Sequence, residues 1–278
     1  MEDKVALVTG STSGVGLAVV KTLVTKGCSV VVTGLGQDST ITNIVAELNI
    51  LKCHPNQSVQ FVPVNLLRPE EIHNFVDQVF GLFPAGVDIL VNNAGIQHVE
   101  SLERFHWSKW EEMLALHLSA PFLLIQRFLP KMKEKGWGRI INIGSVHSII
   151  GAANKVAYTT TKHGLLGLTK AVALDAAEFG VTCNAVCPGL INSPMATQTI
   201  QVDAEEKGIP YEEAKVMLKF VHRILQSTHE DMYVKARHPT GKLVEVDQIA
   251  DTVVFLCTSA GDNMTGSTLM MDGGYTAR

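Results

Sequence analysis

The sequence predicts a single-domain α/β fold in which seven parallel strands form a doubly wound sheet with helices on both faces. Seven short runs rich in β-branched residues alternate with segments of helical periodicity along the whole chain, and no linker divides its 278 residues. Strands that alternate with helices over short loops are typical of right-handed βαβ units, which cover both faces of a parallel sheet. The expected strands are residues 5–8, 29–33, 59–64, 87–91, 139–143, 181–186 and 268–271.

The composition favours a small-molecule ligand over two other classes of partner. Charged residues make up only 18% of the chain, the formal net charge is −4, and no cluster of Lys or Arg is present. Because nucleic acids and anionic membranes bind to concentrated positive charge, neither is expected as a partner. Hydrophobic residues make up 46%, and so little charge leaves less surface to be solvated, which favours an oligomer.

Neither a membrane span nor a leader segment is expected. The apolar stretch 114–125 is interrupted by His117 and Ser119, and it is shorter than the roughly 20 residues that span a bilayer. Met1 stands directly before the first strand, which leaves no room for a signal peptide. The expected location is the cytoplasm.

No metal centre is expected either. The five cysteines are scattered, with no pair at zinc or redox spacing, and no two of the ten histidines form an HExxH pattern. The cysteines are therefore interpreted as free thiols, most of them buried. They are Cys28, Cys53, Cys183, Cys187 and Cys257.

Two segments depart from the alternation of strands and helices. Residues 49–58 are polar and are expected to form a surface loop between the second helix and the third strand. Residues 190–244 interrupt the pattern before the last helix, and 211–226 have helical spacing. Because active-site covers often follow a strand end in this way, the longer segment is expected to be a lid over the site. The alternative is a helical pair that packs on the edge of the domain.

A glycine loop follows the first strand and precedes a helix expected at 15–26. Gly10 can adopt a turn conformation closed to other residues, Gly14 lets the backbone approach phosphate oxygens, and Gly16 lets the helix lie close to the sheet. A helix N-terminus adds free N–H groups that suit a pyrophosphate. In this position the loop predicts a Rossmann-type dinucleotide site rather than an ordinary tight turn.

The second strand ends without a clear signal for either nicotinamide dinucleotide. An acidic residue there would bind the ribose hydroxyls of NAD, and an Arg would accept the 2′-phosphate of NADP, but the chain has Gly34-Leu35-Gly36. Thr12 in the glycine loop is also neutral. With no cation to receive the additional phosphate, NAD is the expected cofactor.

Three residues form a candidate for proton transfer. Tyr158 and Lys162 lie four apart near the start of a helix expected at 158–179, so their side chains lie on one face. A cation close to a phenol lowers its pKa and makes Tyr158 a usable general acid or base. Ser145 follows the fifth strand at the carboxyl edge, where ligands of open α/β sheets bind, and its hydroxyl can hold a substrate oxygen.

With these motifs the chain resembles the short-chain dehydrogenase/reductase family over its whole length. The matching segments are 9–16, Asn92-Asn93-Ala94-Gly95, Ser145, Tyr158 to Lys162 and Pro188-Gly189. The resemblance implies that Tyr158 transfers the substrate proton, Lys162 lowers its pKa and holds the nicotinamide ribose, and Ser145 orients the carbonyl. The cofactor-site residues it implies are Gly10, Thr12, Ser13, Gly14, Val15, Gly16, Leu35, Asn65, Leu66, Asn93, Ala94, Gly95, Tyr158, Lys162, Pro188, Gly189 and Ile191.

Within that family the chain is most similar to the D-3-hydroxybutyrate dehydrogenases. The similarity lies in segments 93–98, 145–147, 154–155 and 272–278. It implies that Gln97, His147 and Lys155 hold a substrate carboxylate, and a cation with neutral donors suits a small anion. A lid glutamine of that group is matched by Thr199, with Gln198 beside it, and either could contact substrate. Their usual terminal Trp is Tyr275 here.

Two positions depart from the family pattern. The family's catalytic Asn, which holds a proton-relaying water, is replaced by His117. Because imidazole also binds water and exchanges protons near neutral pH, we expect His117 to keep the relay; the alternative is that it only packs. Asn65 stands where the family usually has an Asp near the adenine, and it can still form hydrogen bonds.

The sequence therefore predicts NAD-dependent interconversion of D-3-hydroxybutyrate and acetoacetate. Two alternatives stay open: a 3-oxoacyl reductase that uses NADPH on carrier-bound chains, and a catalytically silent dinucleotide-binding protein, suggested by the change to His117. The resemblance also implies a homotetramer built on the two long helices, expected at 107–133 and 158–179.

Overall fold

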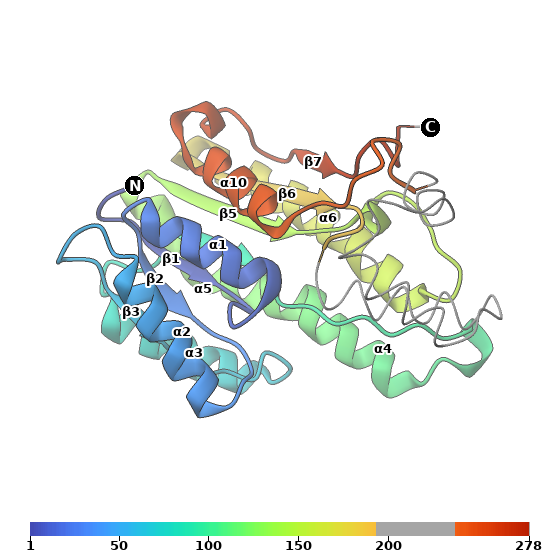
Figure 1. Ribbon diagram of the computed structural model, residues 1–278, viewed down its shortest axis with the longest axis horizontal. Helices are drawn as coiled ribbons and strands as arrows, with labels where there is room; N and C mark the ends of the chain where they lie inside the picture. The colour runs from blue at the N-terminus through green and yellow to red at the C-terminus, as the bar shows by residue number, and fades with distance from the viewer. Residues whose placement is uncertain (193–236, 278) are drawn as a thin grey trace.

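The computed structural model describes residues 1–192 and 237–277, which form a seven-stranded parallel sheet covered on both faces (Figure 1). The strand order β3-β2-β1-β4-β5-β6-β7 reverses direction of winding at β1, as the doubly wound prediction requires. The strands are β1 (Val5–Val8), β2 (Ser29–Val32), β3 (Val59–Phe61), β4 (Ile89–Asn92), β5 (Gly138–Ile143), β6 (Val181–Pro188) and β7 (Thr268–Met271).

The helices lie in two layers, one on each face of the sheet (Figure 1). Alternation along the strands separates the two cores: Ala6 and Val8 of β1 face one layer and Leu7 faces the other. The first layer is α1 (Gly14–Thr25), α2 (Asp38–Ile50) and α10 (Val246–Cys257). The second is α3 (Pro69–Leu82), α5 (Ala120–Lys135) and α6 (Val156–Ala176).

The expected helix 107–133 is interrupted. It consists of α4 (Trp107–Leu114), a π-helical segment (Ala115–Ser119) and α5. A π-segment adds a residue to one turn and commonly marks a functional position, and here it contains His117. The sequence analysis, which treated 107–133 as one continuous helix, did not predict this segment.

The run Trp107–Lys135 is also long and apolar enough to cross a membrane by length and composition, with a mean hydropathy of 1.3. Its buried side chains, such as Leu124, Phe128 and Met132, belong to the core on one face of the sheet. It is therefore a core helix of this fold. Trp107 and Phe122 on the same run remain exposed.

The polar loop between α2 and β3 is anchored to the sheet and is shorter than expected, since Asn49 and Ile50 belong to α2. Gln57 is only 4% exposed, and its amide donates to the carbonyls of Val24 and Cys28. Its side-chain oxygen accepts from the backbone N–H of Cys53 at 2.7 Å. One buried glutamine thus ties this surface segment to the end of α1.

The expected lid, 190–244, lies mostly outside the described residues, and so does its helical segment 211–226. At its two ends Ile191 forms a parallel bridge with Val244, and Asn192 N–H donates to the Val244 carbonyl at 2.9 Å. The chain therefore leaves and rejoins the sheet at one place, beside the carboxyl end of β6.

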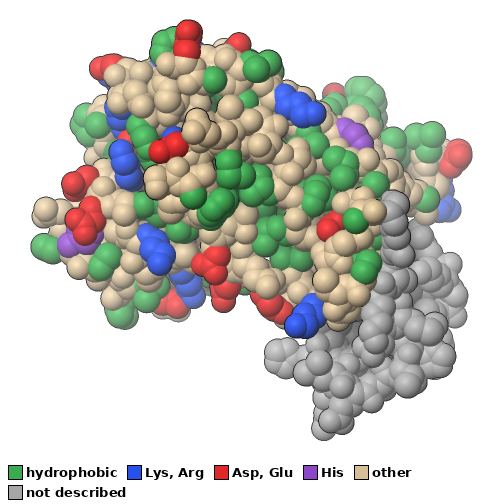
Figure 2. Space-filling model, turned by 90° about the horizontal axis from the view of Figure 1, so that it is seen from above, with side chains coloured by type: hydrophobic (Ala, Val, Ile, Leu, Met, Phe, Trp, Pro, Cys, Tyr) green, Lys and Arg blue, Asp and Glu red, His purple; other side chains and the backbone are tan. Residues whose placement is uncertain are grey.

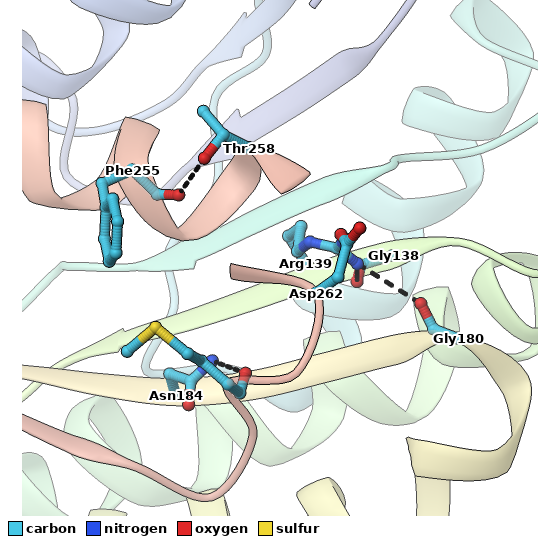
Figure 3. A network of polar contacts seen from close by, with 8 residues as sticks. Gly138, Arg139, Gly180, Asn184, Phe255, Thr258 and Asp262 are labelled. Carbon is cyan, nitrogen blue, oxygen red and sulfur yellow. Dashed lines mark hydrogen bonds and ion pairs between the residues drawn. The ribbon is translucent and has the colours of Figure 1, made fainter. Parts of the chain in front are cut away.

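A buried cation lies at the opposite, amino end of β5. Arg139 is 2% exposed, and its guanidinium donates to the Gly138 and Gly180 carbonyls and pairs with Asp262 (Figure 3). The guanidinium also lies 4.4 Å from the centroid of the Trp137 ring. These contacts join β5 to the turn that leads into β7.

Candidate active site

The carboxyl ends of β1, β4, β5 and β6 deliver the predicted residues to one edge of the sheet. These ends point toward the side of the molecule from which α4 projects (Figure 1). Parallel strands place their carboxyl ends together, so segments far apart in sequence converge there. The edge carries the glycine loop after β1, residues 93–97 after β4, Ser145 after β5 and Gly189 after β6.

The glycine loop is shaped for an anion. Gly10 has φ +63°, a left-handed conformation that favours glycine, and α1 begins at Gly14 without a side-chain cap on its N-terminus. No acidic residue lies in the first turn of α1. Uncapped N–H groups at a helix start attract a phosphate, so the loop fits the pyrophosphate of a dinucleotide.

Gly16 lies where α1 approaches the glycine loop most closely. A Cβ at this position would lie 2.3 Å from the Gly10 carbonyl oxygen and 2.6 Å from Asn93 Nδ2. Both neighbours are fixed, because the Asn93 amide itself donates to the backbone carbonyls of Thr9 and Gly10. The glycine is needed for contact between α1 and its own loop as well as for helix packing on the sheet.

Gly16→Ala is expected to raise the Kd for NADH at least tenfold and to destabilise the fold by about 1–3 kcal/mol, the usual cost of overpacking. Fluorescence titration and thermal unfolding measure the two effects. Gly81→Ala in α3 is the matched control, since nothing lies within 4 Å of its added Cβ. Equal NADH affinity in the two variants would contradict this account of the loop.

Thr9 connects the glycine loop to the segment after β4. Its hydroxyl accepts the backbone N–H groups of Asn93 and Ala94, each at 2.9 Å. The resemblance implied that Asn93, Ala94 and Gly95 line the cofactor site. In the structure Asn93 is hydrogen-bonded to the glycine loop and holds the two segments together. The hydrogen bonds that Thr9 accepts were not predicted.

The end of β2 carries no positive charge. Leu35 is 86% exposed, and the Thr12 hydroxyl donates to its carbonyl at 2.8 Å. The acidic Asp38 begins α2 only three residues later and is exposed. Sequence reasoning missed Asp38 because it looked for an acid at the strand end itself.

Asn65 is committed to a turn. Its side-chain oxygen accepts the Leu67 N–H at 3.1 Å, and its own backbone N–H donates to Glu71. The turn places Asn65 and Leu66 after β3, at the same edge as the glycine loop. The side-chain oxygen is thus occupied, and only the amide N–H groups of Asn65 remain to meet an adenine.

Ser145, Tyr158 and Lys162 lie together as predicted. A hydrogen bond joins the hydroxyls of Ser145 and Tyr158, and Lys162 Nζ lies 5.6 Å from the centroid of the Tyr158 ring. Lys162 Nζ donates to the Ile143 carbonyl at 2.7 Å. The start of α6 therefore holds a proton-transfer pair against the end of β5.

Burial is the main influence on the pKa values of Tyr158 and Lys162. Part of Tyr158 is accessible to solvent, but the surrounding protein raises the pKa of its phenol, and the bond from Ser145 only partly opposes this. Burial lowers the pKa of Lys162 to about 8. The expected lowering of the Tyr158 pKa by Lys162 does not outweigh desolvation in this structure, because Lys162 Nζ is bonded to Ile143 and not to the phenol.

Two histidine rings flank the Tyr158 ring. His117 and His147 each meet it edge to face, with centroids at 5.7 Å and 6.0 Å. The backbone N–H of His147 donates to Ser145 Oγ, which ties the position of His147 to that of Ser145. Sequence spacing predicted His147 near Ser145 but not its contact with Tyr158.

His117 is 2% exposed and bonded at both ring nitrogens. Nε2 accepts the Ile96 N–H at 3.0 Å, and Nδ1 lies 2.8 Å from Thr161 Oγ1. Neither nitrogen is left for a water molecule, so the geometry does not support the proton relay expected through this ring. Thr161 was not predicted as a partner.

The other predicted substrate residues follow the carboxyl ends of β4 and β7 or precede α6, where the structure describes them. Gln97 is half-buried, and its Nε2 is shielded from solvent without a hydrogen-bond partner. Lys155, 9% exposed, precedes α6, and the Glu100 N–H donates to the Asn154 carbonyl, which joins these two loops. Tyr275 is half-buried after β7, while Gln198 and Thr199 lie outside the described residues.

A residue that sequence reasoning missed shapes the loop after β6. His238 is fully buried; its Nε2 accepts the Leu190 N–H at 2.8 Å and its Nδ1 donates to the Lys242 carbonyl at 2.7 Å. A Cβ on Gly189 would lie 2.3 Å from His238 Nε2. His238 thus positions the segment Pro188–Ile191, predicted to contact the nicotinamide. Among the described residues no cluster of His, Cys, Asp or Glu could hold a metal.

Comparison with known protein families identifies the class to which the chain belongs. Residues 4–203 match the family described as short chain dehydrogenase, and residues 219–276 match a family described as enoyl-(acyl carrier protein) reductase. The chain belongs to the short-chain dehydrogenase/reductase family and is an oxidoreductase of that family.

Full-length relatives include D-beta-hydroxybutyrate dehydrogenases. The chain is 39% identical over 277 residues to that of Rhizobium meliloti, covering 99% of each chain. It is 36% identical over 278 residues to that of Cupriavidus necator, covering 100% of each. A 3-oxoacyl-(acyl-carrier-protein) reductase of Aquifex aeolicus is 33% identical, over 99% of this chain and 98% of that protein.

Solved structures share the fold. A blue fluorescent protein from a metagenomic library, crystallised in complex with NADPH, has a TM-score of 0.80 and 29% identity over 99% of this chain and 98% of its own. Levodione reductase has a TM-score of 0.85 and 24% identity over 100% of this chain and 99% of its own, and supports the fold alone.

Proposed function

We propose that this protein oxidises D-3-hydroxybutyrate to acetoacetate reversibly, with NAD as the cofactor. The observation that carries the proposal is the buried, unpartnered Gln97 Nε2. A buried amide N–H without an acceptor costs free energy, and a ligand oxygen would supply that acceptor. The two D-beta-hydroxybutyrate dehydrogenases at 39% and 36% identity support the choice of substrate.

The geometry suits a small carboxylic acid. Gln97 directly follows Ile96, which is bonded to His117 beside Tyr158. The His147 ring contacts the Tyr158 ring, and Lys155 directly precedes α6, the helix that carries Tyr158. A cation and neutral donors around the reacting centre would bind a carboxylate one carbon away from the carbinol.

The nicotinamide dinucleotide, when bound, supplies the hydride acceptor at the carboxyl edge of the sheet. In the direction of acetoacetate reduction, the protonated phenol of Tyr158 donates its proton to the substrate oxygen, and in the direction of oxidation its phenolate takes the proton of the substrate hydroxyl. Ser145, bonded to that oxygen, orients the substrate and stabilises the developing carbonyl. Lys162 keeps a positive charge beside the phenol and would hold the ribose through Nζ.

NAD is favoured over NADP by charge. From the glycine loop to the start of α2, residues 10–20 and 34–38 contain no Lys or Arg, and Asp38 is the one charged group among them. An exposed carboxylate at that helix start would repel a 2′-phosphate and accept the ribose hydroxyls. The competing function, NADPH-dependent 3-oxoacyl reduction, is represented by the relative at 33% identity.

A coupled absorbance assay tests the proposal. D- and L-3-hydroxybutyrate are each compared with NAD and with NADP, and acetoacetate with a carrier-linked 3-oxo substrate. We expect turnover of the D isomer with NAD. Turnover confined to the carrier-linked substrate with NADPH would replace the proposal with the reductase, and NADH binding without any turnover would identify a silent binding protein.

Gln97→Leu is expected to raise KM for D-3-hydroxybutyrate about 10- to 100-fold, the value of a hydrogen bond to a charged group, with less effect on kcat. The leucine keeps the volume of the side chain but donates nothing. Steady-state kinetics measure the change, and Gln78→Leu on the exposed face of α3 is the matched control. An unchanged KM would show that the amide does not bind the carboxylate.

We also propose a homotetramer built on the α4–α5 run and α6. Trp107, Phe122 and Leu174 on these helices are 69%, 48% and 81% exposed, an apolar surface that a partner subunit would bury. On another face, apolar side chains gather between charged ones (Figure 2). Phe255 of α10 is also 43% exposed. Mass measurement in solution gives the number of subunits.

A further inference from the structure

We propose that His117 is a positioning residue that joins the substrate loop after β4 to the catalytic helix α6, in partnership with Thr161. This inference rests on the proposed function for its kinetic readout. It assigns to the ring two fixed hydrogen bonds within the protein in place of a water relay.

The hydrogen bonds define one tautomer of His117. The Ile96 N–H donates to Nε2 at 3.0 Å, so Nε2 carries no proton. The Thr161 hydroxyl donates to the Tyr158 carbonyl at 3.0 Å, so its oxygen is free to accept from Nδ1–H at 2.8 Å. The ring is therefore neutral with its proton on Nδ1, and every polar atom of the pair has a partner.

One hydrogen bond of His117 leads to the proposed substrate-binding loop, and the other leads to the helix that carries Tyr158. Ile96 precedes Gln97, the proposed carboxylate ligand, and a Cβ at Gly95 would already lie 3.2 Å from His117 Nε2. Thr161 is fully buried next to Lys162 and is bonded to the first turn of α6, which carries Tyr158. The His117 imidazole thereby fixes the loop that carries Gln97 relative to the first turn of α6, which carries Tyr158.

The surroundings keep the ring neutral. Desolvation and, to a smaller extent, the nearby Lys162 cation lower the pKa of His117 to about 3. The titratable groups that face it are Lys162 and Tyr158, both on α6. A proton on Nε2 would also collide with the Ile96 N–H, so protonation would break the connection.

Two conservative variants separate the bonds. The Oε1 of His117→Gln can replace Nε2 as acceptor for Ile96 but offers nothing at the Nδ1 position. The Nδ2 of His117→Asn can replace Nδ1 as donor to Thr161 but leaves the Ile96 N–H unpaired. We expect His117→Asn to raise KM for D-3-hydroxybutyrate at least fivefold with a smaller change in kcat. We expect His117→Gln to lower kcat at least fivefold with a smaller change in KM.

Thr161→Val should reproduce the kinetic effect of His117→Gln, and the double variant should be no slower than either single one, since both remove the same bond. His163→Gln is the matched control, because His163 lies on the exposed face of α6 and, within 1–192 and 237–277, forms its hydrogen bond with the Thr159 carbonyl of its own helix. A purely structural role would lower Tm while leaving the KM and kcat effects of His117→Asn and His117→Gln alike, and that result would overturn the proposal.

A second measurement needs no substrate. Nitrogen-15 spectra of the wild-type protein should show His117 with its proton on Nδ1 from pH 8 to pH 5. The unfolded chain takes up a proton near pH 6.5 and folded His117 does not, so the free energy of unfolding should fall with pH below 6.5, less steeply in His117→Asn. A ring that titrates between pH 6 and 7 would restore the relay and overturn the proposal. Absence of turnover would instead overturn the proposed function alone.

Discussion

Tyr158→Phe is expected to lower kcat by about 10²–10⁴-fold, the contribution of a positioned general acid or base. The phenyl ring keeps the edge-to-face contacts with His117 and His147, so the variant removes the hydroxyl without opening a cavity. The bond to Ser145 is lost with it. Steady-state turnover of D-3-hydroxybutyrate with NAD measures the effect.

NADH titration of the same variant provides the control. Affinity should change much less than kcat, because the phosphates of the cofactor would bind at the glycine loop and the uncapped start of α1, which the substitution leaves intact. A variant that binds NADH normally and retains more than a tenth of wild-type kcat would remove Tyr158 from proton transfer.

Asp262→Ala is expected to destabilise the fold by about 3 kcal/mol, because it leaves the buried Arg139 guanidinium without its counter-charge. Arg139 is 2% exposed and Asp262 is 55% exposed at the side chain, so the two partners are unequal. The Gly138 and Gly180 carbonyls and the Trp137 ring still contact the guanidinium and limit the loss.

Arg139→Met should lower the free energy of unfolding by less, about 1 kcal/mol, because a buried methionine needs no counter-charge and the half-exposed Asp262 remains solvated. Denaturant unfolding of both variants at neutral pH measures the difference. The site lies at the amino end of β5, away from Ser145, so kcat should be unchanged in both. If Arg139→Met lost more free energy of unfolding than Asp262→Ala, the unpaired buried guanidinium would not be the source of the destabilisation.

The seven parallel strands and the helices on both faces of the sheet could be predicted from sequence because short β-branched runs alternate with segments of helical periodicity along the chain. The glycine loop, Ser145, Tyr158 and Lys162 could be predicted because their spacing is short or fixed by a strand end. Strand ends were less certain: β3 stops at Phe61 and β6 continues to Pro188, since pairing with β2 and β7 sets the limits.

Other features depend on contacts between distant residues, which a single sequence does not display. His117 and Thr161 are 44 positions apart, and His238 meets Leu190 across 48. The relay through His117 was expected because His117 stands at the position of the family's catalytic Asn. The structure changes that interpretation, because His117 lies in a π-helical segment with both ring nitrogens bonded within the protein. Arg139 looked like an ordinary strand residue until Asp262, 123 positions later, was placed beside it.

The pairing of Ile191 with Val244 has a consequence for engineering. Because the entry and exit of the intervening segment lie side by side and are held by backbone bonds, the ends of a replacement segment need only match that spacing. The sheet, the cofactor loop and the proton-transfer residues belong to other parts of the chain. Exchange of 193–243 between relatives would therefore test whether this segment is the expected lid: a changed substrate range with the same cofactor would support that expectation.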